Sequence, residues 1–355
     1  MNKINFPGNY LKQEQTDAPI QTSEPISSSV RSLLLLLLGL LALSSTAIFI
    51  KLSIREISAE ATVFNRLWIA TLVFTSWNWG WQPWREQKQE SSKEIVLKNK
   101  DTTSQDTWIV IVQLLSLALV HLTGRLLWTW SLTQTTAANG TMLANMPPLF
   151  TALGGWLFLG QRFDRRFLTG LGIAVGGAIA LTLGDWLQPK EELFGATALI
   201  GDTAAFLSSV FYAGSFLLME KLRQRLTTSD ILAWRCTIGL MIVAPFVWAI
   251  DDSMFPVSSI GWTAVIGLAV FSEVIGHGLI VYSLKYFSSA FVTIVLLLEP
   301  APAAGIAWLL FGEFLDFTNI VGFILITIGI YLAKTGKGAD GENQNNSASP
   351  VQKEL

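Results

Sequence analysis

Two pairs of ionisable residues stand inside apolar stretches of this sequence. His121 and Arg125 are four residues apart, and so are Glu273 and His277. Four residues make about one helical turn, so each pair shares one face of a helix. Arginine binds carboxylates, histidine changes charge near neutral pH, and a desolvated carboxylate can bind a proton. These residue types therefore favour binding of a charged solute, with movement of a proton as a further option.

Two interpretations fit these four residues. They line a central cavity, with Arg125 as a fixed cation for a substrate carboxylate or other acceptor, or they form an internal ion-pair network that only holds helices together. We expect the cavity, because charged groups inside a membrane are costly and are usually kept for a site. Trp128 continues the face of His121 and Arg125 and could stack on a substrate. Nothing in the sequence makes the histidines and Glu273 converge, so we expect no metal site and no cofactor.

The two ionisable pairs belong to an internal repeat with a constant offset of 152 residues. The offset places His121 on Glu273 and Arg125 on His277. It also matches residues that set backbone geometry or packing, without a gap: Pro148 with Pro300, Trp156 with Trp308, Gly160 with Gly312, Gly170 with Gly322 and Gly177 with Gly329. Shared placement of Gly and Pro indicates one structural unit used twice.

Prolines interrupt one apolar stretch in each copy. Glu299 lies beside Pro300 and Pro302, and the corresponding stretch has Asn145 before Pro147 and Pro148. A proline removes a backbone donor and opens the helix, as at transporter sites and hinges. We expect all four prolines to act as hinges, and Asn145 and Glu299 to contact substrate. For Glu299 the alternative is a structural carboxylate that caps a kinked helix.

Arg66 and Arg235 correspond in a looser alignment of the two copies. Both lie one or two turns inside an apolar stretch. They could hold a carbonyl or a neighbouring acid, or extend to the membrane surface. We expect the second, because long basic side chains near helix ends commonly reach the interface.

The composition predicts an all-α integral membrane protein. Hydrophobic residues make up 51% of the 355 residues and charged residues 14%. A spanning helix needs roughly 20 apolar residues. Ten segments of this kind are expected at about 32–51, 60–82, 108–130, 137–159, 167–184, 196–219, 230–250, 258–283, 288–311 and 318–334. The single cysteine, Cys236, excludes an internal disulfide framework.

Five spans in each copy place the second copy upside down relative to the first. The fold expected is therefore ten transmembrane helices in two inverted five-helix repeats, at 32–184 and 196–334. Residues 1–31 and 335–355 are expected to be disordered cytoplasmic tails, and 83–106 a basic cytoplasmic loop. Basic residues concentrate on the side of this loop and both tails, and only a few fall on the other side, namely Lys51, Arg55 and Lys190. This bias predicts cytoplasmic termini, in what we expect to be the plasma membrane.

Three motifs resemble those of the EamA family in the drug/metabolite transporter superfamily. They are Leu298-Glu299-Pro300, the run 308–313 (WLLFGE), and the run 201–205 (GDTAA). The resemblance covers about residues 32–334 and implies a ten-helix transporter with its site between the halves. The first copy departs from the pattern, with Met146-Pro147-Pro148 and with Gln161 in place of an acid.

The function expected is secondary transport, and the resemblance to the family implies export. The substrate would be a small metabolite such as an amino acid, moved by alternating access, with proton coupling as an option. The alternatives are an uncoupled facilitator or channel and, from another class, a membrane scaffold or sensor. Enzyme motifs such as His-Glu-x-x-His and Gly-x-Ser-x-Gly are missing from the sequence, so we expect no enzyme. The expected partners are the small-molecule substrate, the bilayer and protons, with no nucleic acid; the oligomeric state is open.

Overall fold

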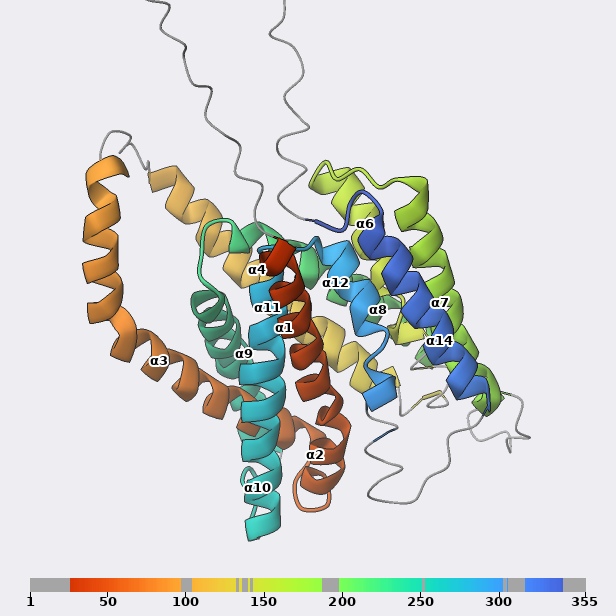
Figure 1. Cartoon of the computed structure of the whole chain (residues 1–355). Helices are drawn as coiled ribbons and strands as arrows, with labels where there is room; N and C mark the ends of the chain where they lie inside the picture. Colours follow the sequence, from red (N-terminus) through yellow and green to blue (C-terminus); the bar gives the residue numbers. More distant parts are fainter. Residues whose placement is uncertain are drawn as a thin grey trace, which may run out of the picture.

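The computed structural model describes residues 26–96, 104–131, 134–135, 140, 143–186, 198–250, 253–302, 305 and 317–340. Regular secondary structure within these residues is helical, and the helices lie together in one bundle (Figure 1). The first half contains α1 (Ile26–Ser44), α2 (Thr46–Ser53), α3 (Ala59–Val96), α4 (Ser104–Ser131), α6 (Pro147–Phe158) and α7 (Arg165–Trp186). The second half contains α8 (Ala198–Arg223), α9 (Thr228–Ile250), α10 (Ser259–Gly267), the π-helix η2 (Leu268–His277), α11 (Gly278–Ser283), α12 (Ser289–Leu296) and α14 (Phe317–Thr335).

Six helical segments of the described chain are long and apolar enough to cross a membrane. They are Val30–Ile50, Trp108–Trp128, Leu199–Arg223, Thr228–Ile250, Ser259–Ser283 and Thr318–Thr335. The outward surface of the bundle carries many large apolar side chains, as a lipid-facing surface requires. The protein is therefore a multi-pass membrane protein.

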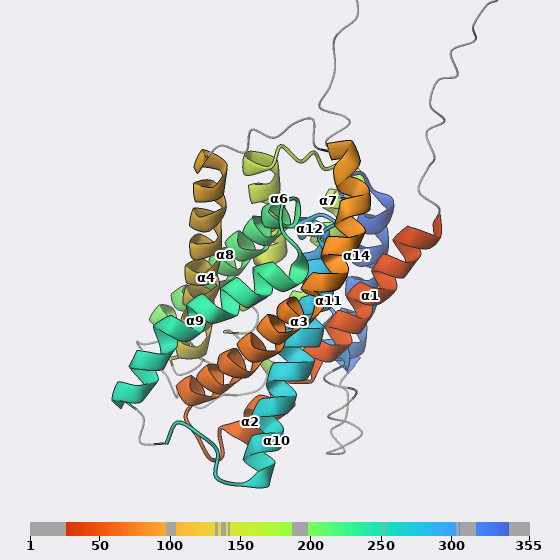
Figure 2. The same ribbon diagram turned by 90° about the vertical axis from the view of Figure 1, so that its left-hand side faces the viewer.

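The basic loops gather at one end of the bundle. The start of α1, the end of α14 and the facing ends of α3 and α4 lie at that end (Figures 1 and 2). The connections from α6 to α7 and from α11 to α12 lie there too. At the opposite end, the Glu56 carboxylate accepts hydrogen bonds from the backbone N–H groups of Val257 and Ser258. This contact joins the loop after α2 to the loop before α10.

Both proline motifs follow a break in a helix. α6 begins at Pro147, directly after the non-helical residues Asn145 and Met146. In the second half α12 ends at Leu296, and a turn at 297–299 precedes Pro300. Proline fits the first turn of a helix because its missing N–H would have no partner there. Residues 306–316, which carry part of the repeated motif, lie outside the described residues.

The helices α7 and α14 pack backbone against backbone through four glycines, side by side in Figure 1. A Cβ atom on Gly170 would lie 2.6 Å from Gly329 O, and one on Gly177 would lie 2.8 Å from Gly322 O. Contacts this close exclude any side chain at these positions. Small residues that allow such an approach are typical of helix pairs in membranes.

The C-terminal tail is ordered further than the sequence predicted. We expected disorder from residue 335, but residues 336–340 pack against two loops. Ser288 donates hydrogen bonds from N to Ala339 O at 2.9 Å and from Oγ to Gly338 O at 2.6 Å. Lys334 Nζ lies 2.6 Å from Asp340 Oδ1. Gly338 has a φ of 114°, which glycine adopts readily, and this turns the chain toward the loop.

Two further boundaries differ from those expected. α1 begins at Ile26, so the N-terminal tail ends before residue 31. α3 continues to Val96, so 83–96 is helical and not a loop. This stretch is rich in Glu, Gln and Lys, which favour helix once a preceding turn has formed. Residues 1–25, 97–103, 187–197 and 341–355 lie outside the described residues.

Asp164 caps the start of α7, and its replacement by alanine should destabilise the protein by about 1 kcal/mol. The Asp164 carboxylate accepts a hydrogen bond from Phe167 N at 2.8 Å. Asparagine keeps an acceptor at this position, so Asp164→Asn should cost less. Thermal unfolding of both purified variants tests this order, and equal stability of Asp164→Ala and wild type would refute the cap.

The backbone N–H of Phe167, and next that of Lys337, hold the pKa of Asp164 below its usual 3.8. The stabilisation from this carboxylate is therefore complete above about pH 3.8 and is lost as the pH falls through the lower, folded-state pKa. The difference between wild type and Asp164→Ala should thus be full at pH 7 and shrink below pH 3.8.

Candidate functional site

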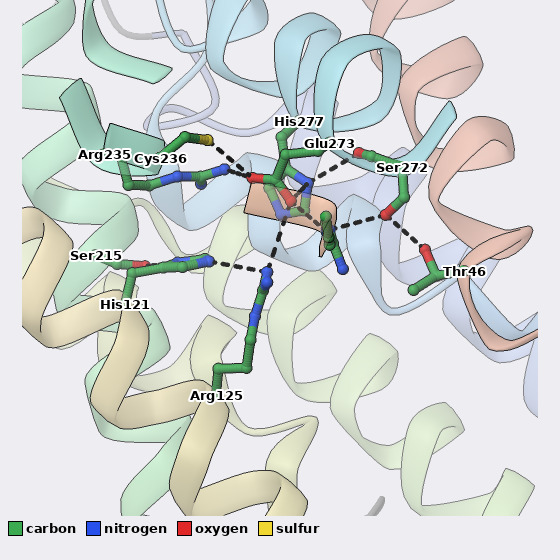
Figure 3. A network of polar contacts seen from close by, with 10 residues as sticks. Thr46, His121, Arg125, Ser215, Arg235, Cys236, Ser272, Glu273 and His277 are labelled. Carbon is green, nitrogen blue, oxygen red and sulfur yellow. Dashed lines mark hydrogen bonds and ion pairs between the residues drawn. The ribbon is translucent and has the colours of Figure 1, made fainter. Parts of the chain in front are cut away.

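The buried carboxylate of Glu273 is the centre of a polar cluster inside the helix bundle (Figure 3). Glu273 lies on η2 and is 1% exposed. Arg66 of α3 places Nε 2.5 Å from Glu273 Oε2, and Arg235 of α9 forms an ion pair with Glu273 Oε1. The cluster therefore joins residues far apart in the sequence around one negative charge.

Arg125 and His121 approach the same carboxylate from α4. Arg125 Nη2 lies 3.8 Å from Glu273 Oε2 and 3.3 Å from His121 Nε2. On the other side His121 Nδ1 lies 3.4 Å from Ser215 Oγ of α8. The arginine is thus close enough for electrostatic attraction to Glu273, but too far for a hydrogen bond to it.

His277 completes the ring of ionisable groups. Its Nδ1 lies 3.0 Å from Ser272 O and 3.9 Å from Glu273 Oε2. The centroids of the His277 and His121 rings are 5.9 Å apart, with the rings edge to face. The structure therefore brings together the two pairs that the sequence singled out, His121 with Arg125 and Glu273 with His277.

The polar residues Ser272, Glu273 and His277 all lie on the π-helical segment η2. The sequence led us to expect a regular α-helix here, but Leu268–His277 is π-helical between α10 and α11. A π-helix has more residues per turn than an α-helix, and π-helical turns are frequent at functional sites. Ser272 also accepts hydrogen bonds from Arg66 Nη2 at 2.9 Å and from Thr46 Oγ1 at 2.8 Å.

Three guanidinium groups surround one glutamate in this cluster. Arg66 and Arg235 form ion pairs with Glu273, and Arg125 lies 3.8 Å from the same carboxylate. Arg235 is 3% exposed, and its Nη1 has no hydrogen-bond partner among the described residues. Buried donors of this kind are rare and call for an explanation.

A small cavity opens beside Arg235. Its volume is about 20 Å³, enough for about one water molecule. The cavity is lined by polar and apolar residues: His121, Arg125, Arg235, Glu273, Leu67, Ala118, Leu122 and Gly239. Arg235, whose Nη1 has no partner among the described residues, thus lines a cavity that borders the cluster.

The prediction that Arg66 and Arg235 extend to the membrane surface is wrong. Both are buried and bind Glu273. The expectation was wrong because α3 and α9 pack against each other and turn these side chains inward. Their equivalence in the repeat was the signal that pointed to a shared internal partner.

The other predicted site residues do not bind Glu273 directly, although Glu299 is close enough to Arg66 for an electrostatic interaction. Trp128, Asn145 and Glu299 are half-buried. Within the described part of the chain, no hydrogen bond or ion pair joins their side chains to Glu273 or to the arginines around it. Their contact with a substrate therefore stays a prediction. The described residues also hold no group of three His, Cys, Asp or Glu side chains that could bind a metal.

The known proteins that this chain resembles in sequence are transporters. The sequence matches the model of the EamA-like transporter family over residues 30–183 and again over residues 199–335. It is 27% identical over 203 residues to the pseudopaline exporter CntI of Pseudomonas aeruginosa, which covers 57% of this chain and 67% of that protein. It is 25% identical over 301 residues to an uncharacterized transporter of Archaeoglobus fulgidus, covering 84% of this chain and 96% of the other.

A solved crystal structure shares the fold. It superposes with a TM-score of 0.68 at 14% sequence identity, and the match covers 86% of this chain and 97% of that chain. Each of the two stretches that match the family model contributes residues to the polar cluster. Arg66 and Arg125 lie in the first matched stretch, and Arg235 and Glu273 in the second.

Proposed function

This chain belongs to the EamA-like transporter family, and we propose that it is a secondary carrier that exports a small metabolite, such as an amino acid, by alternating access. The observation that carries the proposal is the buried cluster around Glu273, which joins residues of both family-matched stretches beside a cavity. Intramembrane ionisable groups in such a place are typical of a solute pathway. Export is proposed because a relative is named as an exporter.

Reciprocal contacts support two inverted repeats. Gly170 meets Gly329 and Gly177 meets Gly322. The 152-residue offset converts Gly170 into Gly322 and Gly329 into Gly177, so exchanging the two repeats converts one contact into the other. An approximate two-fold axis between the repeats requires this relation. The contact also runs in opposite directions along α7 and α14, so the two helices are antiparallel.

Two further contacts correspond at the level of whole helices, although their partners are not related by the same 152-residue offset. Gly124 of α4 packs on Ser208 and Phe211 of α8, and its equivalent Gly276 of η2 packs on Leu43 of α1. α1 and α8 are the first helices of the two proposed repeats. A carrier built in this way reaches its opposite-facing state when the halves exchange conformations.

The size of the cavity supports rocking of the halves. A space of about 20 Å³ is too small for an amino acid, so helices must separate before a metabolite can enter. The helix breaks before Pro147 and Pro300 are places where the chain can bend without losing helical hydrogen bonds. We therefore keep Pro147, Pro148, Pro300 and Pro302 as hinges, and His121, Arg125, Trp128, Asn145, Glu273, His277 and Glu299 as the substrate site.

The end of the bundle that carries the basic loops is proposed to face the cytoplasm. Arg162 in the connection from α6 to α7 and Arg165 and Arg166 at the start of α7 lie there, as do Lys334 and Lys337 near the end of α14. Excess Lys and Arg in short loops marks the cytoplasmic side. Both termini of the described chain would then be cytoplasmic, in the plasma membrane.

Counterflow in proteoliposomes tests the carrier. Vesicles loaded with an unlabelled amino acid mixture should accumulate labelled external amino acid transiently, because a carrier exchanges solutes across its two states. Arg125→Gln should lower this flux about tenfold or more, since a hydrogen bond to a charged group contributes about 1.5–3 kcal/mol. Arg165→Gln, at an exposed arginine, is the matched control and should retain wild-type flux.

Other results would favour the alternatives. Flux without trans-stimulation by the internal pool would indicate a facilitator or channel. A flux that rises with an imposed pH gradient would add proton coupling to the carrier. Absence of any flux above empty vesicles, with a folded protein, would contradict the carrier and favour a scaffold.

A further inference from the structure

The segment that follows α14 connects loops of the two proposed repeats. Residues 336–340, which we call the strap, first contact the connection from α6 to α7 in the first repeat. There the backbone N–H of Asp164 donates a hydrogen bond to Lys337 O at 3.2 Å. The strap then reaches the connection from α11 to α12 in the second repeat, where an antiparallel β-bridge joins Phe287 and Asp340. Both connections lie at the end of the bundle that carries the basic loops (Figure 1).

The strap packs closely against both loops. Ala339 is 0% exposed. A Cβ atom on Gly336 would lie 2.6 Å from Phe167 N, and one on Gly338 would overlap the ring of Phe163. Gly338 also has a φ of 114°, a backbone conformation that residues with a side chain rarely adopt. A larger residue at position 338 would therefore displace the strap from the loops.

A buried carboxylate bridges the same two connections. Glu220 of α8 is 6% exposed and accepts hydrogen bonds from Gln161 Nε2 at 2.6 Å and from Ser289 N at 2.9 Å. Gln161 lies between α6 and α7, and Ser289 begins α12. Further along both helices, the hydroxyl groups of Thr151 and Thr293 form a hydrogen bond of 2.8 Å. These contacts close the bundle between α6 and α12 at this end.

The closing contacts are of a kind that water can replace. Gln161 and Ser289 are neutral donors to Glu220, and a hydrogen bond of this type contributes little net free energy when water is the alternative. Gln161 Oε1 is also buried without a hydrogen-bond partner in the described chain. Water that enters on opening would satisfy this atom. Additional contacts, such as those of the strap, can therefore decide whether this end stays closed.

Building on the alternating access proposed above, we propose that the strap is a latch on a cytoplasmic gate formed by α6, α12 and Glu220. The gate opens when the strap leaves Phe287 and Ser288, because only then can the two connections separate. The chain's own C-terminal segment thus sets how often the carrier faces the cytoplasm.

Maleimide labelling of a buried cysteine measures opening of the gate, whether or not the protein transports a solute. Thr293→Cys places the reporter between α6 and α12, at a position that is 2% exposed. In the full-length purified protein, Gly338→Val should raise the labelling rate of this cysteine about tenfold or more, because the lost strap contacts favour the open gate. Lys337→Gln is the matched control on the strap. It changes an exposed side chain and keeps the backbone contact, so the labelling rate should stay the same.

A second reporter separates opening of the gate from unfolding. Ser53 is 0% exposed, lies at the opposite end of the bundle, and is hydrogen-bonded to Thr62 as Thr293 is to Thr151. Ser53→Cys should label at the same rate with and without Gly338→Val. The chain with its single natural cysteine, Cys236, gives the background rate.

A reversible lock tests the same latch during transport. Residues opposite each other in an antiparallel bridge lie within reach of a disulfide, so Phe287→Cys with Asp340→Cys should tie the strap to its loop when oxidised. Counterflow should then stop, and dithiothreitol should restore it. The reduced form of the same protein is the control for the two substitutions.

Several outcomes would overturn the latch. Equal labelling of the Thr293→Cys reporter with Gly338→Val and with Lys337→Gln would do so. An equal rise at the Ser53→Cys reporter would show that the strap holds the whole fold and not the gate. Counterflow that continues in the oxidised lock would refute the latch while the carrier stands. Faster labelling with Gly338→Val at the gate alone, in a protein without counterflow, would refute the carrier while the latch stands.

Discussion

Replacement of Glu273 by glutamine is expected to abolish transport and to destabilise the folded protein by about 3–5 kcal/mol, because it leaves buried charges without their partner. Arg66 and Arg235 both bind this carboxylate, and Arg125 lies 3.8 Å from it. Without Glu273, three guanidinium groups would repel one another at a place that water barely reaches. Thermal unfolding in detergent and counterflow in proteoliposomes measure the two effects.

Two control variants separate charge from shape. Glu60→Gln makes the same change at an exposed residue of α3 and should stay within about 0.5 kcal/mol of wild type. The double variant Arg66→Gln with Glu273→Gln removes one charge of each sign. It should be more stable than Glu273→Gln alone, because the net charge of the cluster returns to the wild-type value. Stability of Glu273→Gln equal to that of wild type would show that the cluster is not held together by its charges.

The sequence predicted much of this cluster through the repeat. His121, Arg125, Glu273 and His277 were singled out as residues of charged type in apolar stretches, and the structure places them together. The membrane character and the transporter family were predicted from composition and motifs, and both are confirmed. These features depend on residue type and spacing, which a sequence displays directly.

The inward direction of Arg66 and Arg235 could not be predicted in this way. A residue one or two turns inside a helix end can reach water or the bundle interior, and the tilt of the helix decides between them. The π-helical conformation of Leu268–His277 could not be predicted either, because it leaves no local signal in the composition. The ordering of residues 336–340 depends on contacts with the distant Ser288.

Substitution of Gly170 by alanine should destabilise the protein by about 1–3 kcal/mol, because the added methyl group has no space. Its Cβ atom would lie 2.5 Å from Ala333 N and 2.6 Å from Gly329 O. These are backbone atoms and cannot rotate away, so α7 and α14 would have to separate. Gly172→Ala is the matched control on the same helix, since a Cβ atom there meets nothing within 4 Å. It should be neutral or stabilising by up to about 1 kcal/mol, the difference in helix propensity.

If a two-fold axis relates the two repeats, the two glycines of this interface should respond equally to substitution. Gly329→Ala places its methyl group 2.6 Å from Ala174 N and from Gly170 O, so its cost should equal that of Gly170→Ala. The double variant should cost clearly less than the sum of the two, because the first methyl group already separates the helices and makes room for the second. Thermal unfolding of the three variants measures this coupling. Strictly additive costs would mean that the two glycines act at independent places and not across one shared contact.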